Sequence, residues 1–141
     1  MAQAQGTRTA RRILVVDDNQ DAADSLAMLI GVRGDEVRIA YDGAQALAVE
    51  REFHPDVILL DIGLPALSGY DVAERVRASR GDKVLIVAIT GWGQEKDLRR
   101  AEDAGIDHHF TKPVDFEALV ALIERAGPID RAGSPRRGRR G

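Results

Sequence analysis

The stretch that decides the fold is PDVILLDIGLP, residues 55–65. Its apolar run, Val57–Leu60, is continuous and ends at a carboxylate, Asp61. A short, unbroken apolar run is typical of a strand that is covered on both faces, as in a parallel sheet. The stretch therefore predicts a buried strand that carries Asp61 at its carboxyl end.

Four other segments have the character of strands. Ile13–Val16 and Val84–Ile89 are continuous apolar runs, and Val37–Ala40 alternates as an edge strand does. Asp107–Thr111 is less regular, because His108, His109 and Phe110 form its middle. With the central run, these segments predict five strands.

Five segments with the helical spacing of apolar residues separate and follow these strands. Start signals open two of them: Asp42 stands three residues before Gln45, and Ser68 and Asp71 have the spacing of a capping box. The expected helices cover about residues 23–30, 42–48, 68–76, 94–104 and 115–126. Strands that alternate with helices predict an open α/β sheet with right-handed crossovers, which binds ligands beyond the carboxyl ends of its strands.

The bulk properties fit one globular domain. The chain has 141 residues, of which 44% are hydrophobic, and it has no cysteine, which excludes disulfides, thiolate metal sites and thiol nucleophiles. No apolar run approaches the roughly 20 residues that span a bilayer. Residues 1–12 are polar and lack the apolar core of a signal peptide, so we expect a cytoplasmic protein.

Charge divides the chain into three parts. Residues 1–12 carry +3 and residues 127–141 carry +4, which leaves −10 for residues 13–126 out of a total of −3. We expect a flexible tail over 1–10, a folded domain over 11–126 and a basic, disordered tail over 127–141. The acidic domain argues against nucleic acid as its main partner, whereas the basic tail is either a solubilising end or a contact for an acidic partner, membrane or nucleic acid.

Polar residues stand where the predicted strands end. The first strand runs into Asp17 and Asp18, the central strand into Asp61, the fourth into Thr90 and the fifth into Lys112. These ends share one edge of a parallel sheet, so we expect the five side chains to converge. The alternative for Asp17 and Asp18 is that they only cap the helix that follows them.

Three carboxylates in one cleft repel one another, which calls for a proton or a bridging cation. Mg²⁺ fits, because it takes one or two carboxylates, several waters and a phosphate oxygen. A rigidly held carboxylate such as Asp61 can act as a nucleophile toward phosphorus, with Lys112 supplying positive charge and Thr90 a hydroxyl donor. Pro113 follows the lysine, and an X-Pro bond can adopt the cis form.

These residues resemble a known family. ILVVDDN (13–19), PDVILLDIGLP (55–65), ITG (89–91) and TKPV (111–114) are similar to the motifs of response-regulator receiver domains of two-component signal transduction, over roughly residues 11–126. The resemblance implies a flavodoxin-like, doubly wound, five-stranded parallel sheet of order 2-1-3-4-5 with five helices. It also implies a cis Lys112–Pro113 bond.

The resemblance assigns roles in a phosphorelay. Asp61 matches the phosphoacceptor, Asp18 the direct ligand of Mg²⁺ and Asp17 the ligand that binds through water, while the backbone carbonyl of Gly63 is a further metal ligand. The family implies an aspartyl phosphate, and so a phosphoprotein, with a phosphohistidine donor on a histidine kinase or a histidine phosphotransfer protein.

The resemblance also implies a switch. Thr90 matches the switch hydroxyl and Lys112 the lysine of the site, but His109 stands where the family usually has an aromatic switch residue. Trp92 is bulkier than the residues common at its position; it either shields the aspartyl phosphate from water or packs against the fourth helix. His108 and His109 are not expected to form a metal site, because neighbouring strand residues point to opposite faces.

The predicted function is therefore a phosphoacceptor switch that catalyses only its own phosphorylation and dephosphorylation and is not otherwise an enzyme. Residues 127–141 are too few for a DNA-binding domain, so we expect no output domain and no direct DNA binding. Downstream protein targets or a dimer partner are expected on the face of the fourth helix, fifth strand and fifth helix. The alternatives are a phosphorylation-independent interaction module and an aspartate-nucleophile phosphatase, which has a second Asp where this chain has Asn19.

Overall fold

The computed structural model describes residues 10–91 and 98–126, which contain all five predicted strands. The strands are β2 (Arg12–Val16), β3 (Glu36–Ala40), β4 (Val57–Asp61), β5 (Leu85–Thr90) and β6 (His108–Thr111). The helices are α1 (Gln20–Gly31), α2 (Gly43–Phe53), α3 (Gly69–Arg80), the 3₁₀ turn η1 (Gly81–Lys83), α4 (Leu98–Ala104) and α5 (Phe116–Ala126). Part of the predicted fourth helix, residues 94–97, and both predicted tails, apart from Ala10, lie outside the described residues.

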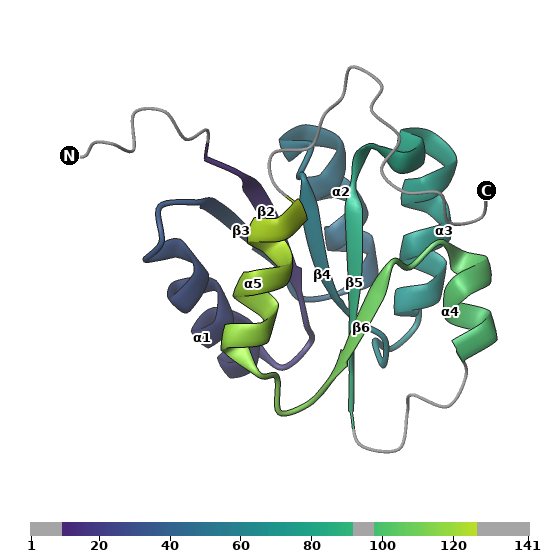
Figure 1. Ribbon diagram of the computed structural model, residues 1–141. Coiled ribbons are helices and arrows are strands. Elements are labelled where there is room, and N and C mark those ends of the chain that lie inside the picture. Colours follow the sequence, from purple (N-terminus) through teal and green to yellow (C-terminus); the bar gives the residue numbers. More distant parts are fainter. Residues whose placement is uncertain (1–9, 92–97, 127–141) are drawn as a thin grey trace.

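The five strands form one parallel sheet in the order β3-β2-β4-β5-β6 (Figure 1). This is the predicted order 2-1-3-4-5, so the doubly wound prediction is confirmed. The register pairs Val16 with Leu60 and Leu60 with Ala88, and it pairs Thr90 with Thr111. The residues that follow these pairs therefore meet at a single edge of the sheet, which we call the carboxyl edge.

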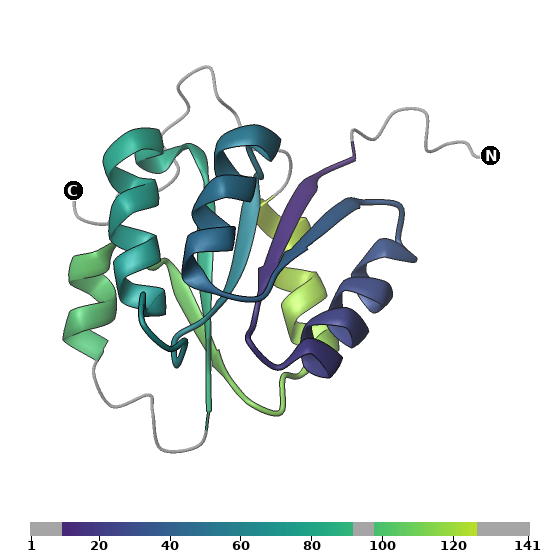
Figure 2. The ribbon, with the colours of Figure 1, turned by 180° about the vertical axis from the view of Figure 1, so that it is seen from behind.

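Helices cover both faces of the sheet, α1 and α5 on one and α2, α3 and α4 on the other (Figures 1 and 2). Alternate strand residues serve the two faces: Leu14 packs in the cluster with Ala46 and Val76, whereas Ile13 packs with Ile30. Each buried Leu or Ile side chain contributes about 1.5–3 kcal/mol to folding. The continuous apolar runs are thus explained, since both sides of each central strand are buried.

The helix starts follow from short polar side chains. Asp42 caps α2 by accepting a hydrogen bond from the Gln45 amide at 2.7 Å, and Ser68 and Asp71 form the predicted capping box at the start of α3. Within the described residues, no helix has the length and apolar character needed to cross a membrane.

Gly69, the first residue of α3, packs against the backbone at the end of β4. A Cβ at this position would lie 2.6 Å from the Asp61 carbonyl oxygen and 2.7 Å from the Ile62 Cα. Both atoms belong to the backbone and cannot turn aside as a flexible side chain does. The absence of a side chain at Gly69 therefore lets α3 sit against the strand end that holds Asp61.

Candidate functional site

Three carboxylates meet at the carboxyl edge, as the sequence predicts. Asp17, Asp18 and Asp61 each place one carboxylate oxygen within 4.8 Å of the others. Asp17 and Asp61 are buried, whereas Asp18 is exposed. The cluster therefore has a protein-facing side and a side open to solvent.

Hydrogen bonds in the loop after β2 position the carboxylate of Asp17 and leave the capping of α1 to another residue. The Asp17 amide donates to the Ala40 carbonyl at 3.1 Å, and Asp17 Oδ1 accepts from the Asn19 amide at 3.0 Å. Asn19, rather than either aspartate, caps α1 by accepting from the Ala22 amide at 3.0 Å. The alternative that Asp17 and Asp18 merely cap the helix is thus wrong, because Asn19 is the N-cap of α1.

Asp61 is held at both of its carboxylate oxygens. Its Oδ1 accepts from the Gly63 amide at 2.9 Å, and its Oδ2 lies 3.5 Å from Lys112 Nζ. The pKa of Asp61 is raised to about 6, chiefly by burial and also by the neighbouring Asp17, while the Gly63 amide and Lys112 act in the opposite direction. Without a metal ion, the site therefore disfavours the fully ionised form of its carboxylates.

Lys112 bridges the two buried carboxylates. Its Nζ lies 3.2 Å from Asp17 Oδ2 and 3.5 Å from Asp61 Oδ2. Burial lowers the pKa of Lys112, but the attraction of Asp61 and Asp17 outweighs burial, so the pKa is raised and the ammonium is favoured. The Lys112 amide donates to the Thr90 carbonyl at 2.8 Å, and the Lys112–Pro113 bond is cis, as predicted.

The donor set fits a hard divalent cation. One ammonium faces three carboxylates, so the cluster carries excess negative charge when all are ionised. The ligand atoms are oxygens, and exposed Asp18 leaves a side where waters can complete a coordination sphere, which suits Mg²⁺. The Gly63 amide bonds to Asp61, whereas the role of the Gly63 carbonyl stays a prediction.

The two predicted switch residues lie on neighbouring strands. Thr90 is buried at the end of β5, and its hydroxyl donates to the Phe110 carbonyl at 3.3 Å rather than to a carboxylate. His109 is exposed on β6, opposite Ala88. Neither His108 nor His109 belongs to the metal-capable cluster found among the described residues. Trp92 lies outside the described residues.

Three contributions were not foreseen from the sequence: the cap by Asn19, the space left by Gly69 and the bond from Thr90 to the Phe110 carbonyl. The first had a signal, since Asn directly before a helical pattern is a favoured cap. The other two depend on through-space distances that no local pattern encodes.

Comparison with known proteins agrees with this geometry. A family model described as the response regulator receiver domain matches residues 13–124. The chain belongs to the response regulator receiver family. The family resemblance stated from the motifs is therefore confirmed, and with it the assignment to two-component signalling.

Curated relatives of this receiver domain are longer proteins. The response regulator MprA of Mycolicibacterium vanbaalenii is 36% identical over 126 residues, which are 86% of this chain and 54% of MprA. The DNA-binding response regulator MtrA of Mycobacterium leprae is 37% identical over 113 residues, which are 80% of this chain and 49% of MtrA. The receiver chain thus spans about half the length of these relatives.

Solved structures share the fold of this receiver domain. A CheY-like response regulator receiver domain from Methanospirillum hungatei has a TM-score of 0.77 and 28% identity, and it covers 83% of this chain and 93% of its own. A putative response regulator from Chloroflexus aurantiacus has a TM-score of 0.75 and 29% identity, with 83% and 97% covered. Both likenesses agree with the flavodoxin-like assignment.

Proposed function

We propose that this receiver domain accepts a phosphoryl group on Asp61 from a phosphohistidine and changes its partner-binding surface in response. One observation carries the proposal: Lys112 Nζ lies within 3.2–3.5 Å of both buried carboxylates, beside an exposed third one. A purely structural ion pair needs one carboxylate for one lysine. Three clustered carboxylates with one ammonium beside them instead leave an excess of negative charge, which suits a metal ion.

The transfer is balanced by the groups present. An Asp61 carboxylate oxygen attacks phosphorus, the O–P bond forms, and the N–P bond to the donor imidazole breaks with its electrons staying on that nitrogen. The product is an acyl phosphate and a free histidine on the donor protein. Lys112 neutralises the phosphoryl oxygens, and its raised pKa keeps it charged at neutral pH.

Asp17, Asp18, Asp61 and the Gly63 carbonyl are the residues that would hold Mg²⁺. When bound there, the ion would supply positive charge to offset the phosphoryl oxygens. Asp17 supports this assignment, because its Oδ1 is fixed by the Asn19 amide and its carboxylate is turned into the site.

The signal is read through β6. Thr90 already bonds to β6 through the Phe110 carbonyl, which directly follows His109. On phosphorylation, the Thr90 hydroxyl leaves this carbonyl and donates to a phosphoryl oxygen, so the β5–β6 contact and His109 move together. The face of α4, β6 and α5, where His109 is exposed, then meets the downstream protein or a second copy.

The partners follow from the family. The donor is a histidine kinase or a histidine phosphotransfer protein, and the receiver is a switch that modifies only itself. DNA binding is part of the names of two relatives, MtrA and RpaA, each of which is about twice as long as the matched region. For this chain, a lack of direct DNA binding and a cytoplasmic location stay predictions.

The test compares the wild-type chain with Asp61→Asn and with a matched control, Asp103→Asn, which changes an exposed aspartate of α4. With candidate kinases and Mg²⁺, we expect stoichiometric, acid-stable and base-labile labelling of the wild type and of the control, and none of Asp61→Asn. Mass spectrometry of the intact chain reads the result. Labelling of Asp61→Asn at the wild-type rate would contradict the proposal.

The same two chains, wild type and Asp61→Asn, also distinguish the receiver function from two other functions. An aspartate-nucleophile phosphatase would turn over a phosphate ester many times, but Asn19 replaces the second aspartate and is occupied as a helix cap. A phosphorylation-independent module would bind its partner equally well as the wild type and as Asp61→Asn. Stoichiometric labelling together with phosphorylation-dependent binding supports the receiver function over both.

A further inference from the structure

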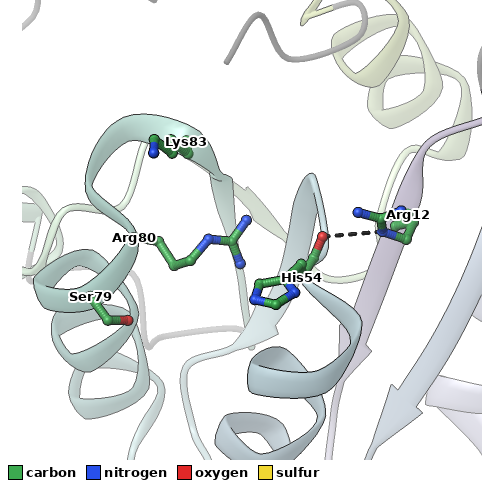
Figure 3. A pocket seen from close by; sticks show the side chains of 5 residues that line it. All are labelled: Arg12, His54, Ser79, Arg80 and Lys83. Atoms are coloured by element: carbon green, nitrogen blue, oxygen red, sulfur yellow. Dashed lines mark hydrogen bonds between the residues drawn. The ribbon is translucent and has the colours of Figure 1, made fainter. Parts of the chain in front are cut away.

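A hollow of about 410 Å³ lies at the amino edge of the sheet, away from the carboxylate cluster (Figure 3). Its lining comes from the start of β2, the end of α2, the end of α3 and the turn η1: Arg12, His54, Ser79, Arg80 and Lys83. β2 is five residues long, so at about 3.3 Å per residue its first and last residues are roughly 13 Å apart. The hollow is therefore separate from the site around Asp61.

The charge of this hollow is opposite to that of the domain. The described residues contain 20 Asp and Glu against 13 Lys and Arg. The lining nevertheless holds three cations, one imidazole and one hydroxyl, and no carboxylate. Such a concentration of cations on an acidic domain favours an anionic ligand.

Part of this lining has a structural role. The Arg80 guanidinium is paired with buried Glu50 and donates to the Pro55 carbonyl at 3.2 Å. Arg12 Nε donates to the carbonyl of His54, the residue that ends α2, at 3.3 Å. These bonds join the ends of β2, α2 and α3, and they are the ordinary role of cations at helix carboxyl ends.

Of the remaining donors, the Ser79 hydroxyl donates to the Val76 carbonyl of its own helix at 3.3 Å, and the others have no such role. Within residues 10–91 and 98–126, the two Nη groups of Arg12, the Lys83 ammonium and the His54 ring have no polar partner in the protein. All three residues are exposed, and Figure 3 shows them around the same hollow, with Arg80 between them. Three unused donors therefore surround a space that a small anion can enter.

We infer that this hollow, the amino-edge basic site of Arg12, His54, Ser79 and Lys83, binds the phosphate groups of a small phosphorylated compound. A guanidinium can hold two phosphate oxygens at once, and an ammonium adds a further charged donor. Apart from the His54 imidazole, the lining includes no aromatic or aliphatic side chain that would hold a base or a ring. The site therefore recognises phosphate charge, and pyrophosphate and nucleoside triphosphates are expected to bind with similar affinity.

The probe is pyrophosphate, titrated into the full chain without Mg²⁺ and followed by amide ¹H–¹⁵N chemical shifts. We expect saturable shifts at His54, Ser79 and Lys83 and none at Asp61 or Lys112, with a dissociation constant below about 1 mM. Arg12→Gln and Lys83→Gln should each weaken binding about tenfold. The control is Arg99→Gln, which makes the same charge change at an exposed position of α4 and should bind as the wild type does.

Three results would overturn the inference: no saturation by about 10 mM pyrophosphate, shifts centred on Lys112, or equal weakening by Arg99→Gln. ATP binding at least tenfold tighter than pyrophosphate would also overturn it, because a base would then be recognised. Lys83→Gln is not expected to disturb folding, since Lys83 is exposed and has no polar partner among the described residues, so weaker binding by this variant reports on the site itself. The measurement uses no phosphotransfer, so it stands or falls apart from the proposed function.

Discussion

The two edges of the sheet treat charge in opposite ways. At the carboxyl edge, Asp17 and Asp61 are buried beside a single shared ammonium, that of Lys112. At the amino edge and beside it, buried acids have their own cations, as in the pairs Arg77–Asp107 and Arg80–Glu50. At the amino edge, which we call the matched side, each of these acids is paired with a cation, which stabilises the fold, whereas the carboxyl edge keeps an excess of negative charge.

Arg77 illustrates the matched side. Its guanidinium donates to the carbonyls of Gly105 at 2.9 Å and Val84 at 2.7 Å, and it pairs with Asp107, whose side chain is fully buried. Asp107 in turn accepts from the Ile86 amide at 2.9 Å. These contacts tie α3 to the starts of β5 and β6. The sheet that carries the excess negative charge at its carboxyl edge is therefore held by paired charges and hydrogen bonds at its amino edge. Substitutions at the two edges should therefore separate activity from stability.

The largest expected effect is at the carboxyl edge. Lys112→Met keeps the length of the side chain but removes the charge that neutralises phosphoryl oxygens. We expect phosphorylation of Asp61 by a small donor such as acetyl phosphate to slow by about 10²–10³-fold. Rates from intact-mass measurements check this, with Arg75→Met, an exposed residue of α3, as the control. A loss below about fivefold would remove Lys112 from the chemistry.

The next effect is on stability at the matched side. Arg77→Met removes the cation that pairs with the buried Asp107 carboxylate and the hydrogen bonds that Arg77 donates to three carbonyls. We expect the free energy of unfolding to fall by about 3 kcal/mol in urea denaturation, while Arg75→Met on the same helix changes it by less than about 0.5 kcal/mol. The phosphorylation rate of the folded Arg77→Met fraction should stay within about twofold. A large loss of rate without loss of stability would reverse the comparison.

A third effect joins the two properties. Gly69→Ala forces a Cβ against the backbone of Asp61 and Ile62, which must shift by several tenths of an ångström. We expect about 1–3 kcal/mol of destabilisation and a slower phosphorylation, because the nucleophile moves with its backbone. Gly31→Ala on α1, whose nearest new contact is at 4.0 Å, is the matched control and should show neither change.

The smallest expected effect is a gain in stability, on replacing Asp61. The pKa of Asp61 is raised to about 6, so its contribution to stability is complete below about pH 3.8 and is lost as the pH rises through 6. In metal-free protein at pH 7.5, Asp61→Asn should therefore be more stable than the wild type by about 1–2 kcal/mol. The difference should vanish near pH 4, as read from urea denaturation across pH with EDTA present.

Magnesium sharpens this last prediction. The proposed Mg²⁺ site exists only in the folded wild type, so adding the ion should raise the wild-type midpoint and leave Asp61→Asn almost unchanged. Asp103→Asn, the exposed control, should follow the wild type throughout. Equal stabilisation of all three chains would mean that Mg²⁺ does not act at the carboxylate cluster.

Much of the fold was accessible from the chain alone. The four apolar residues before Asp61 and the run before Asp17 predicted buried parallel strands, and the capping box at Ser68 marked a helix start that the structure contains. The fourth helix was harder, because its described part, Leu98–Ala104, is short and polar. The strand predicted over Asp107–Thr111 is present as His108–Thr111, although its side chains are largely exposed.

The sequence by itself determined which side chains meet: alternation of strand and helix makes the sheet parallel, and a parallel sheet brings Asp17, Asp18, Asp61, Thr90 and Lys112 to one edge. Only the tertiary structure decided how they meet. It buries Asp17 and Asp61 but leaves Asp18 exposed, turns the Thr90 hydroxyl to the Phe110 carbonyl, and gathers unused cations at the opposite edge. Burial and side-chain direction depend on neighbours that are distant along the chain, and no local pattern encodes those distances.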